Sequence, residues 1–174
     1  LWLYCPAMPT VFLGPVGPLL IVLHALLALV LGGSSVHQAV IATQALRGRP
    51  LPGRLARLYS LIALGAYVAT LVSGALVYPR YRYFVRGLYL DRYAPWASNL
   101  FDFKENLATL GLPLAIGAFM VARELAPARL PGRMGQPAAP PGARLLYGLF
   151  ALGTSLIGVF NIIAGLLCTS VRGL

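Results

Sequence analysis

Long apolar runs alternate with short polar segments along this chain. The four runs cover Pro18–Leu46, Leu58–Tyr78, Asp102–Val121 and Leu145–Val171. Each can supply close to the ~20 apolar residues that cross a ~30 Å hydrocarbon layer as a helix. The pattern therefore predicts an all-α fold, an integral membrane four-helix bundle that forms a single domain over residues 1–174.

The polar segments between the runs differ in character. Residues 126–143 are rich in proline and glycine and are expected to be a surface linker. The segment between the second and third helices is rich in tyrosine and arginine and is predicted to lie at the membrane interface. Two roles remain open for it, binding of lipid phosphate or docking of a partner subunit. The residues predicted for either role are Arg80, Arg82, Arg86, Arg92 and Trp96.

Composition and charge support a membrane location. The chain is 59% hydrophobic and 10% charged, with a mean hydropathy of +0.78, whereas soluble domains carry about 25% charged residues. The net charge of +10 comes mainly from arginines between the runs, so it indicates membrane topology rather than nucleic-acid binding. The loops after the first and third helices hold eight basic residues against six on the other face. This bias predicts that both termini lie on the outer, periplasmic face. The preference for arginine over lysine, with abundant alanine, glycine, proline and leucine, suggests a GC-rich bacterial genome. The expected location is therefore the inner membrane of a bacterium.

The two histidines, His24 and His37, both lie on the first predicted helix. A histidine inside a membrane helix is a functional candidate. A separation of 13 residues places them ~20 Å apart along the helix and on different faces, so they do not ligate one haem together. Several roles stay open. Each histidine could turn inward and hydrogen-bond a neighbouring helix, or ligate a haem b shared with a partner subunit. Met120 on the third helix is a candidate second haem ligand, and copper, proton transfer and quinone binding are further alternatives.

A small polar group precedes the third apolar run. Asp102 is predicted to cap this helix, with Glu105 completing a capping box. Alternatively, Asp102, Glu105 and Asn106 form a polar entry for protons, a cation or a quinone headgroup. With four acids in the chain, we find no convincing pair of catalytic carboxylates, and no phosphate-binding loop or zinc motif. We therefore expect no catalysis by this chain alone.

The last apolar run carries small and polar residues at alternating steps of three and four. Gly158, Asn161 and Gly165 form the centre of this face, which is typical of close contact between membrane helices. Cys168 ends the same face. A disulfide from Cys168 to Cys5 is one interpretation, and two unpaired apolar cysteines are the other.

The run from His24 to Gly33, HALLALVLGG, resembles the opening helix of small bacterial four-helix membrane proteins. The families concerned are the copper-resistance D type and related cytochrome-b-like proteins. This resemblance covers one helix and implies haem or copper handling, or association with respiratory electron transfer. His24 is the one residue of this chain to which the resemblance assigns such a role.

These features together predict an integral subunit of a larger, respiratory or redox, bacterial membrane complex. Its expected roles are scaffold, anchor or shield for a cofactor, and its expected partners are membrane lipids and other membrane subunits rather than nucleic acid. One alternative is a membrane protein that binds haem b or copper through His24 or His37. A small transporter is another.

Overall fold

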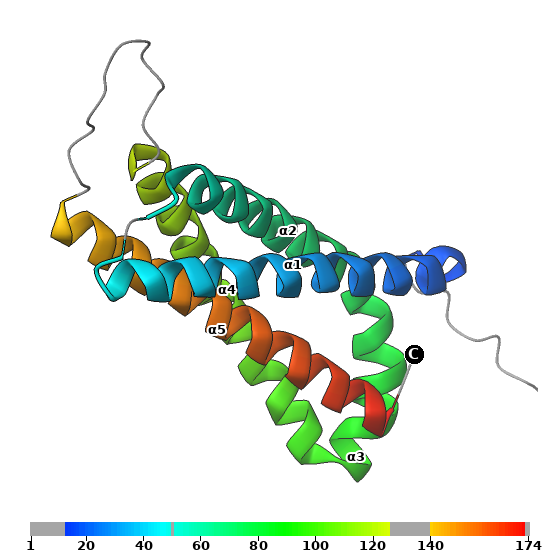
Figure 1. Cartoon of the computed structure of the whole chain (residues 1–174). Coiled ribbons are helices and arrows are strands. Elements are labelled where there is room, and N and C mark those ends of the chain that lie inside the picture. The colour runs from blue at the N-terminus through cyan, green and yellow to red at the C-terminus, as the bar shows by residue number, and fades with distance from the viewer. Residues whose placement is uncertain (1–12, 50, 126–139, 173–174) are drawn as a thin grey trace, which may run out of the picture.

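Four long helices make up most of the computed structural model, which describes residues 13–49, 51–125 and 140–172. A short 3₁₀ turn, η1 (Gly14–Val16), precedes the first of them. The described residues contain no strand, and the predicted all-α four-helix fold is confirmed. The long helices, shown in Figure 1, are α1 (Gly17–Leu46), α2 (Gly53–Arg80), α4 (Pro95–Leu125) and α5 (Pro141–Val171).

The helices form an antiparallel ring in which α1 packs against α2 and α5, and α4 packs against the same two helices. At one end, α1 turns into α2 through Gly48, whose φ of 72° suits glycine. At the other end α2 continues into a π-helix, η2 (Tyr81–Leu90), and a single turn, α3 (Asp91–Tyr93), before α4 begins. We call these the loop end and the α3 end of the bundle.

Small residues fill the interior and large apolar residues cover the outside. Alanines at positions 42, 56, 63, 97, 118, 122 and 151 are fully buried. By contrast Leu19, Leu156 and Leu166 are each about two-thirds exposed, at 69%, 71% and 67%. Such a surface is stable where the surrounding solvent is hydrocarbon, and small interior residues let membrane helices approach closely. All four long helices are long and apolar enough to cross a membrane, so the fold is that of a multi-pass membrane protein.

Two helices extend beyond their predicted bounds at the α3 end. The segment predicted to lie at the interface between the second and third helices is helical through η2 and α3, and α4 starts at Pro95 rather than Asp102. Proline suits the first turn of a helix because the backbone N–H there has no helical partner. Asp102 is therefore not the helix cap, and that prediction is wrong. In the predicted linker 126–143, residues 126–139 lie outside the described part, and Pro141 already begins α5.

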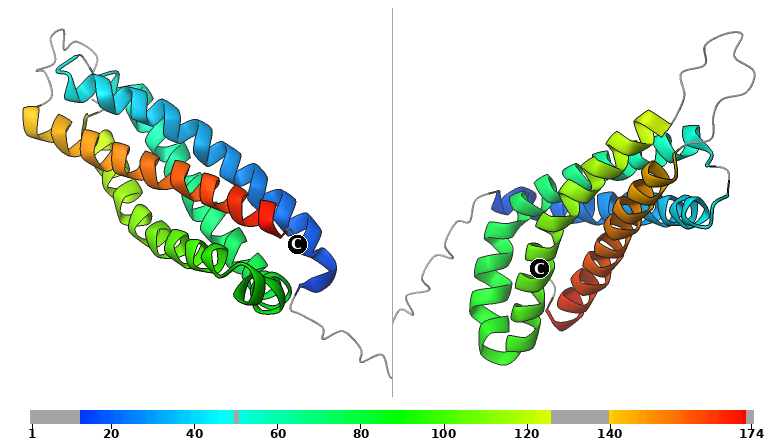
Figure 2. Two further views of the ribbon diagram at one scale, coloured as in Figure 1. Left: turned by 90° about the horizontal axis from the view of Figure 1, so that it is seen from below. Right: turned by 90° about the vertical axis from the view of Figure 1, so that its left-hand side faces the viewer.

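The bundle is closed at the loop end and opens toward the α3 end. Buried residues of all four long helices meet in the core nearest the loops. At the α3 end the core consists of η2, α4 and α5, with no buried residue from α1. Figures 1 and 2 show α1 and α5 diverging toward this end, where α1 follows α2 instead.

Candidate functional site

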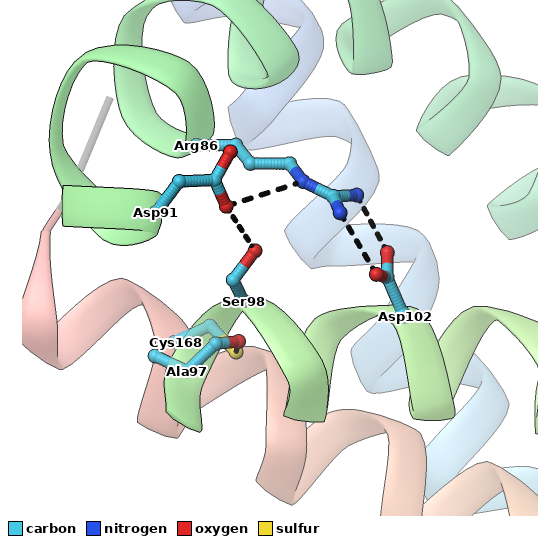
Figure 3. Close-up of polar contacts among 6 residues, drawn as sticks. All are labelled: Arg86, Asp91, Ala97, Ser98, Asp102 and Cys168. Atoms are coloured by element: carbon cyan, nitrogen blue, oxygen red, sulfur yellow. Dashed lines mark hydrogen bonds and ion pairs between the residues drawn. The ribbon is translucent and has the colours of Figure 1, made fainter. Parts of the chain in front are cut away.

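Arg86 is the centre of an ionic network at the α3 end (Figure 3). Its guanidinium donates two hydrogen bonds to the Asp102 carboxylate, at 2.6 and 2.8 Å. The Arg86 Nε also lies 3.6 Å from Asp91 Oδ1, and that oxygen accepts a 2.6 Å hydrogen bond from the Ser98 hydroxyl. The network joins η2, α3 and α4, so it fixes the reversal of the chain between α2 and α4. Bidentate arginine–carboxylate pairs are the geometrically most specific ion pairs.

His24 is hydrogen-bonded to the neighbouring helix, through a 3.0 Å contact between its Nδ1 and Ser73 Oγ. The Ser73 hydroxyl donates its hydrogen to the Thr70 carbonyl at 3.0 Å. The His24 ring also hydrogen-bonds the backbone of Thr70. Two neighbouring residues of α2 therefore hold the imidazole, and contacts of this kind orient the ring of a histidine that ligates a metal.

His37 lies on the outside of the bundle, which does not fit the alternative that it turns inward. Its Nδ1 donates to the carbonyl of Gly33 in its own helix at 2.9 Å. Its ring is stacked on Tyr59 of α2, with 4.7 Å between ring centroids. The Nε2 of His37 is consequently the free acceptor of an exposed, oriented imidazole.

Lys104 and Tyr81 meet at the ring of Phe101. The Lys104 ammonium lies 4.2 Å from the Phe101 ring centroid, and the Tyr81 ring is stacked on Phe101 at 4.0 Å. Tyr81 is 9% exposed, and its hydroxyl has no hydrogen-bond partner among the described residues. Of the charged side chains, Lys104 is the one that interacts electrostatically with both His24 and Cys168.

A second polar group is buried in the middle of the bundle. Gln38 donates to Ser60 on α2 at 3.1 Å, and Ser155 donates to the backbone carbonyl of Ser35 on α1 at 2.8 Å. These bonds tie α1 to its two neighbours. Tyr147 is also fully buried, on α5.

The structure does not bring the candidate haem ligands together. Met120 is 61% exposed on α4, between Ala118 and Ala122, which pack against the C-terminal part of α1. His24 is roughly 25 Å from that part of α1, at about 1.5 Å per residue. Met120 therefore cannot be the second ligand of a haem at His24. No group of three or more histidine, cysteine or acidic side chains suited to a metal occurs among the described residues.

The other candidate residues separate into internal and exposed sets. Of the predicted polar entry, Asp102 is bound to Arg86, Glu105 is half-buried and Asn106 is exposed. Of the predicted docking residues, Arg82, Arg92 and Trp96 are exposed. Arg86 is ion-paired within the network described above, and Arg80 lies over the Phe84 ring.

The helix-packing residues of α5 also differ from one another. Gly158 faces Ser35 of α1 closely, with 3.4 Å from an added Cβ to the Ser35 hydroxyl, whereas a Cβ at Gly165 would meet nothing within 4 Å. Asn161 bonds the Ile157 carbonyl of its own helix. The Cys168 thiol contacts the Ala97 carbonyl at 3.5 Å, and Cys5 lies outside the described residues.

Sequence reasoning missed Lys104, Tyr81, Ser60, Ser73 and Ser155 as contact residues. A signal for Lys104 was present in the spacing, because positions 97, 101, 104, 108, 111 and 115 follow one helix face at steps of three and four. The serine contacts leave no such signal, since a serine on a helix can also bond its own backbone. Comparison with protein-family models, curated proteins and solved structures finds no match to this chain.

Proposed function

We propose that this protein is an integral subunit of a larger bacterial membrane complex, of respiratory or redox type, with both termini on the periplasmic face of the inner membrane. The observation that carries the proposal is the position of His37. An imidazole on the outside of an apolar membrane helix is costly in lipid and favours a protein or cofactor contact. Its ring is already oriented by Gly33 and Tyr59.

The contacts of the other polar side chains support a structural role in such a complex. Arg86 with Asp102, His24 with Ser73 and Gln38 with Ser60 each join one helix to another. Polar groups used in this way hold a bundle together. The exposed His37 and the half-buried Tyr59 are then the surface that a neighbouring subunit would cover, as scaffold, anchor or shield.

The proposal is tested by mild solubilisation of native membranes followed by native mass spectrometry. We expect the wild-type chain in a particle heavier than its own 18.5 kDa. His37→Leu should release it from that particle, because the substitution removes the contact without adding polarity. His24→Leu is the matched control, since His24 contacts α2 within the chain. A wild-type chain that purifies as a stable monomer, or a His37→Leu chain that stays assembled, would contradict the proposal.

A second function is favoured by the orientation of His24. Because Ser73 and Thr70 of α2 hold its ring, His24 is a positioned candidate ligand for haem b or copper. An absorption spectrum of the haem-replete preparation should then contain a Soret band that His24→Ala abolishes. Absence of this band together with absence of copper by elemental analysis would exclude this second function.

A further inference from the structure

Lys104 occupies an interior position of the bundle. The face of α4 that runs through Ala97, Phe101, Gly111 and Ala115 is buried, and Lys104 lies on the same face, where it is half-buried. Side chains on a helix point back toward its N-terminus. This direction brings the ammonium over the Phe101 ring at 4.2 Å, toward the α3 end.

None of the chain's four acids forms an ion pair with Lys104. Asp91 and Asp102 are bound to Arg86, and Glu124 lies beside Arg123 at the loop end. Glu105 follows Lys104 directly and interacts with it electrostatically, but the two side chains form no ion pair, because adjacent residues of a helix do not face each other. An ammonium inside a membrane helix requires an anionic or polar partner. Among the described residues Lys104 has the Phe101 ring and the electrostatic influence of Glu105, but no carboxylate in ion-pair contact.

A second buried hydrogen-bond donor is the hydroxyl of Tyr81, the other residue that contacts the Phe101 ring. The Tyr81 ring is stacked on Phe101 at 4.0 Å, and the buried Tyr81 hydroxyl has no hydrogen-bond partner in the described structure. An unmatched buried hydroxyl costs free energy. Lys104 and Tyr81 therefore both offer hydrogens to an acceptor beside the same ring.

The bundle is open on the side where such an acceptor would enter. The core at this level contains no buried residue of α1, and a Cβ on Gly165 of α5 would meet nothing within 4 Å. The two helices that diverge here also carry exposed apolar side chains, among them Leu23 and Leu26 on α1 and Leu166 and Leu167 on α5. These can contact an acyl chain.

The depth and charge of this region match a phospholipid headgroup. Exposed Tyr93 and Trp96 lie at the α3 end, and such residues favour the headgroup level. Lys104 is only about 12 Å further along α4 than Trp96, at ~1.5 Å per residue. Six basic residues (Arg80, Arg82, Arg86, Arg92, Lys104, Arg172) against three acids (Asp91, Asp102, Glu105) give this end a net charge of +3.

From these observations we infer that Lys104 binds the phosphate of an acidic phospholipid whose acyl chains lie along α1 and α5, with the Tyr81 hydroxyl as an additional donor. A lipid fits the opening better than the carboxylate of a partner helix, because a headgroup on flexible chains can enter between two diverging helices. This lipid site does not depend on the proposed subunit role.

The test uses the full-length protein in nanodiscs of phosphatidylcholine and phosphatidylglycerol in equal amounts. Bound lipid is counted by native mass spectrometry after gentle release into detergent. We expect the wild type to retain phosphatidylglycerol in preference to phosphatidylcholine. Lys104→Met should lower this preference about tenfold, as for loss of one charge-assisted hydrogen bond. Lys104→Arg should keep it, and Tyr81→Phe should lower it by a smaller factor.

Arg172→Gln is the matched control for charge, because Arg172 is exposed at the same end, lies over the Tyr89 ring and has no ion-pair partner among the described residues. It should retain most of the preference. Three results would overturn the inference: equal loss in Arg172→Gln and Lys104→Met, an unchanged preference in Lys104→Met, or displacement of the wild-type lipid by millimolar inorganic phosphate. The first indicates general surface charge, the second a different partner for Lys104 and the third a site for free anions.

Discussion

At the scale of single residues, Arg86 makes unequal contacts with two acids, and the difference is testable. Two short hydrogen bonds join it to Asp102, but only a 3.6 Å contact joins it to Asp91. Asp102→Asn should lower the free energy of unfolding by roughly 1–2 kcal/mol, because a charge-assisted bidentate pair is lost while Asp102 is partly exposed. The measurement is the unfolding midpoint in mixed detergent micelles.

Asp91→Asn is the control for this prediction. An asparagine at position 91 can still accept the Ser98 hydrogen bond and loses only the longer contact to Arg86. We expect a loss below about 1 kcal/mol. A larger loss for Asp91→Asn than for Asp102→Asn would show that the geometry of the network is wrong.

Close packing at Gly111 gives a second prediction at this scale. A Cβ built on Gly111 overlaps the hydroxyl of Tyr67, which donates a 2.9 Å hydrogen bond to the Ala108 carbonyl. Gly111→Ala should therefore destabilise the bundle by about 1–3 kcal/mol, the usual cost of overpacking. In the same unfolding assay, the double variant with Tyr67→Phe should recover part of this loss, since the two residues are coupled.

Gly65 provides the matched comparison for Gly111. It lies in α2, where an added Cβ meets nothing within 4 Å. Gly65→Ala should be neutral or stabilising by up to about 1 kcal/mol, because alanine is the better helix residue. If both alanine variants behaved alike, contact with Tyr67 would not be the reason for glycine at position 111.

At the scale of elements, the π-helix η2 is expected to be the least protected part of the α3 end. Its wider turns have poorer hydrogen-bond geometry than an α-helix. By hydrogen–deuterium exchange, amides of Tyr81–Leu90 should exchange about tenfold faster than those of residues 97–106 in α4, a difference in opening free energy of about 1.4 kcal/mol. The α4 segment is the control because it packs against η2 at the same end.

The same exchange experiment can separate the two interactions that stabilise η2, the ionic network and the apolar core. Arg86→Gln removes the ionic network but leaves Val85 and Leu90 buried in the apolar core. Exchange in η2 should then rise further, while exchange in the middle of α2 should not change. Equal exchange in η2 and α4 in the wild type would contradict a weaker π-helical segment.

The elements also show what the sequence could and could not predict. The lengths of the apolar runs located all four long helices, and α1 begins one residue earlier than predicted. These lengths did not locate the start of α4. The charges of Asp102, Lys104 and Glu105 suggested a helix boundary, but Arg86 of η2 neutralises Asp102, which lies within α4. The partners His24–Ser73 and Gln38–Ser60 depend on how helices rotate against each other, which single-chain periodicity does not determine.

At the scale of the whole molecule, charge and packing vary together from one end to the other. The loop end is tightly packed through all four long helices. The α3 end is open on the α1 side and holds every acid except Glu124. A bundle closed at one end and open at the other presents its two membrane faces differently, so its orientation decides which leaflet supplies lipid to Lys104.

The orientation of the bundle in the membrane follows from the distribution of the basic residues. Loops at the loop end hold eight of them against six at the α3 end, and the richer side remains in the cytoplasm. In a background with Cys5→Ser and Cys168→Ala, we expect Tyr93→Cys in intact bacteria to react with a membrane-impermeant maleimide. Arg49→Cys should react only after lysis. Both positions are exposed, so protection from the maleimide would reflect the membrane rather than burial in the fold.

Arg172→Cys is the internal control and should be labelled like Tyr93→Cys, because both lie at the α3 end. Labelling of Arg49→Cys in intact cells, with protection of the other two, would place the Lys104 site on the cytoplasmic leaflet instead.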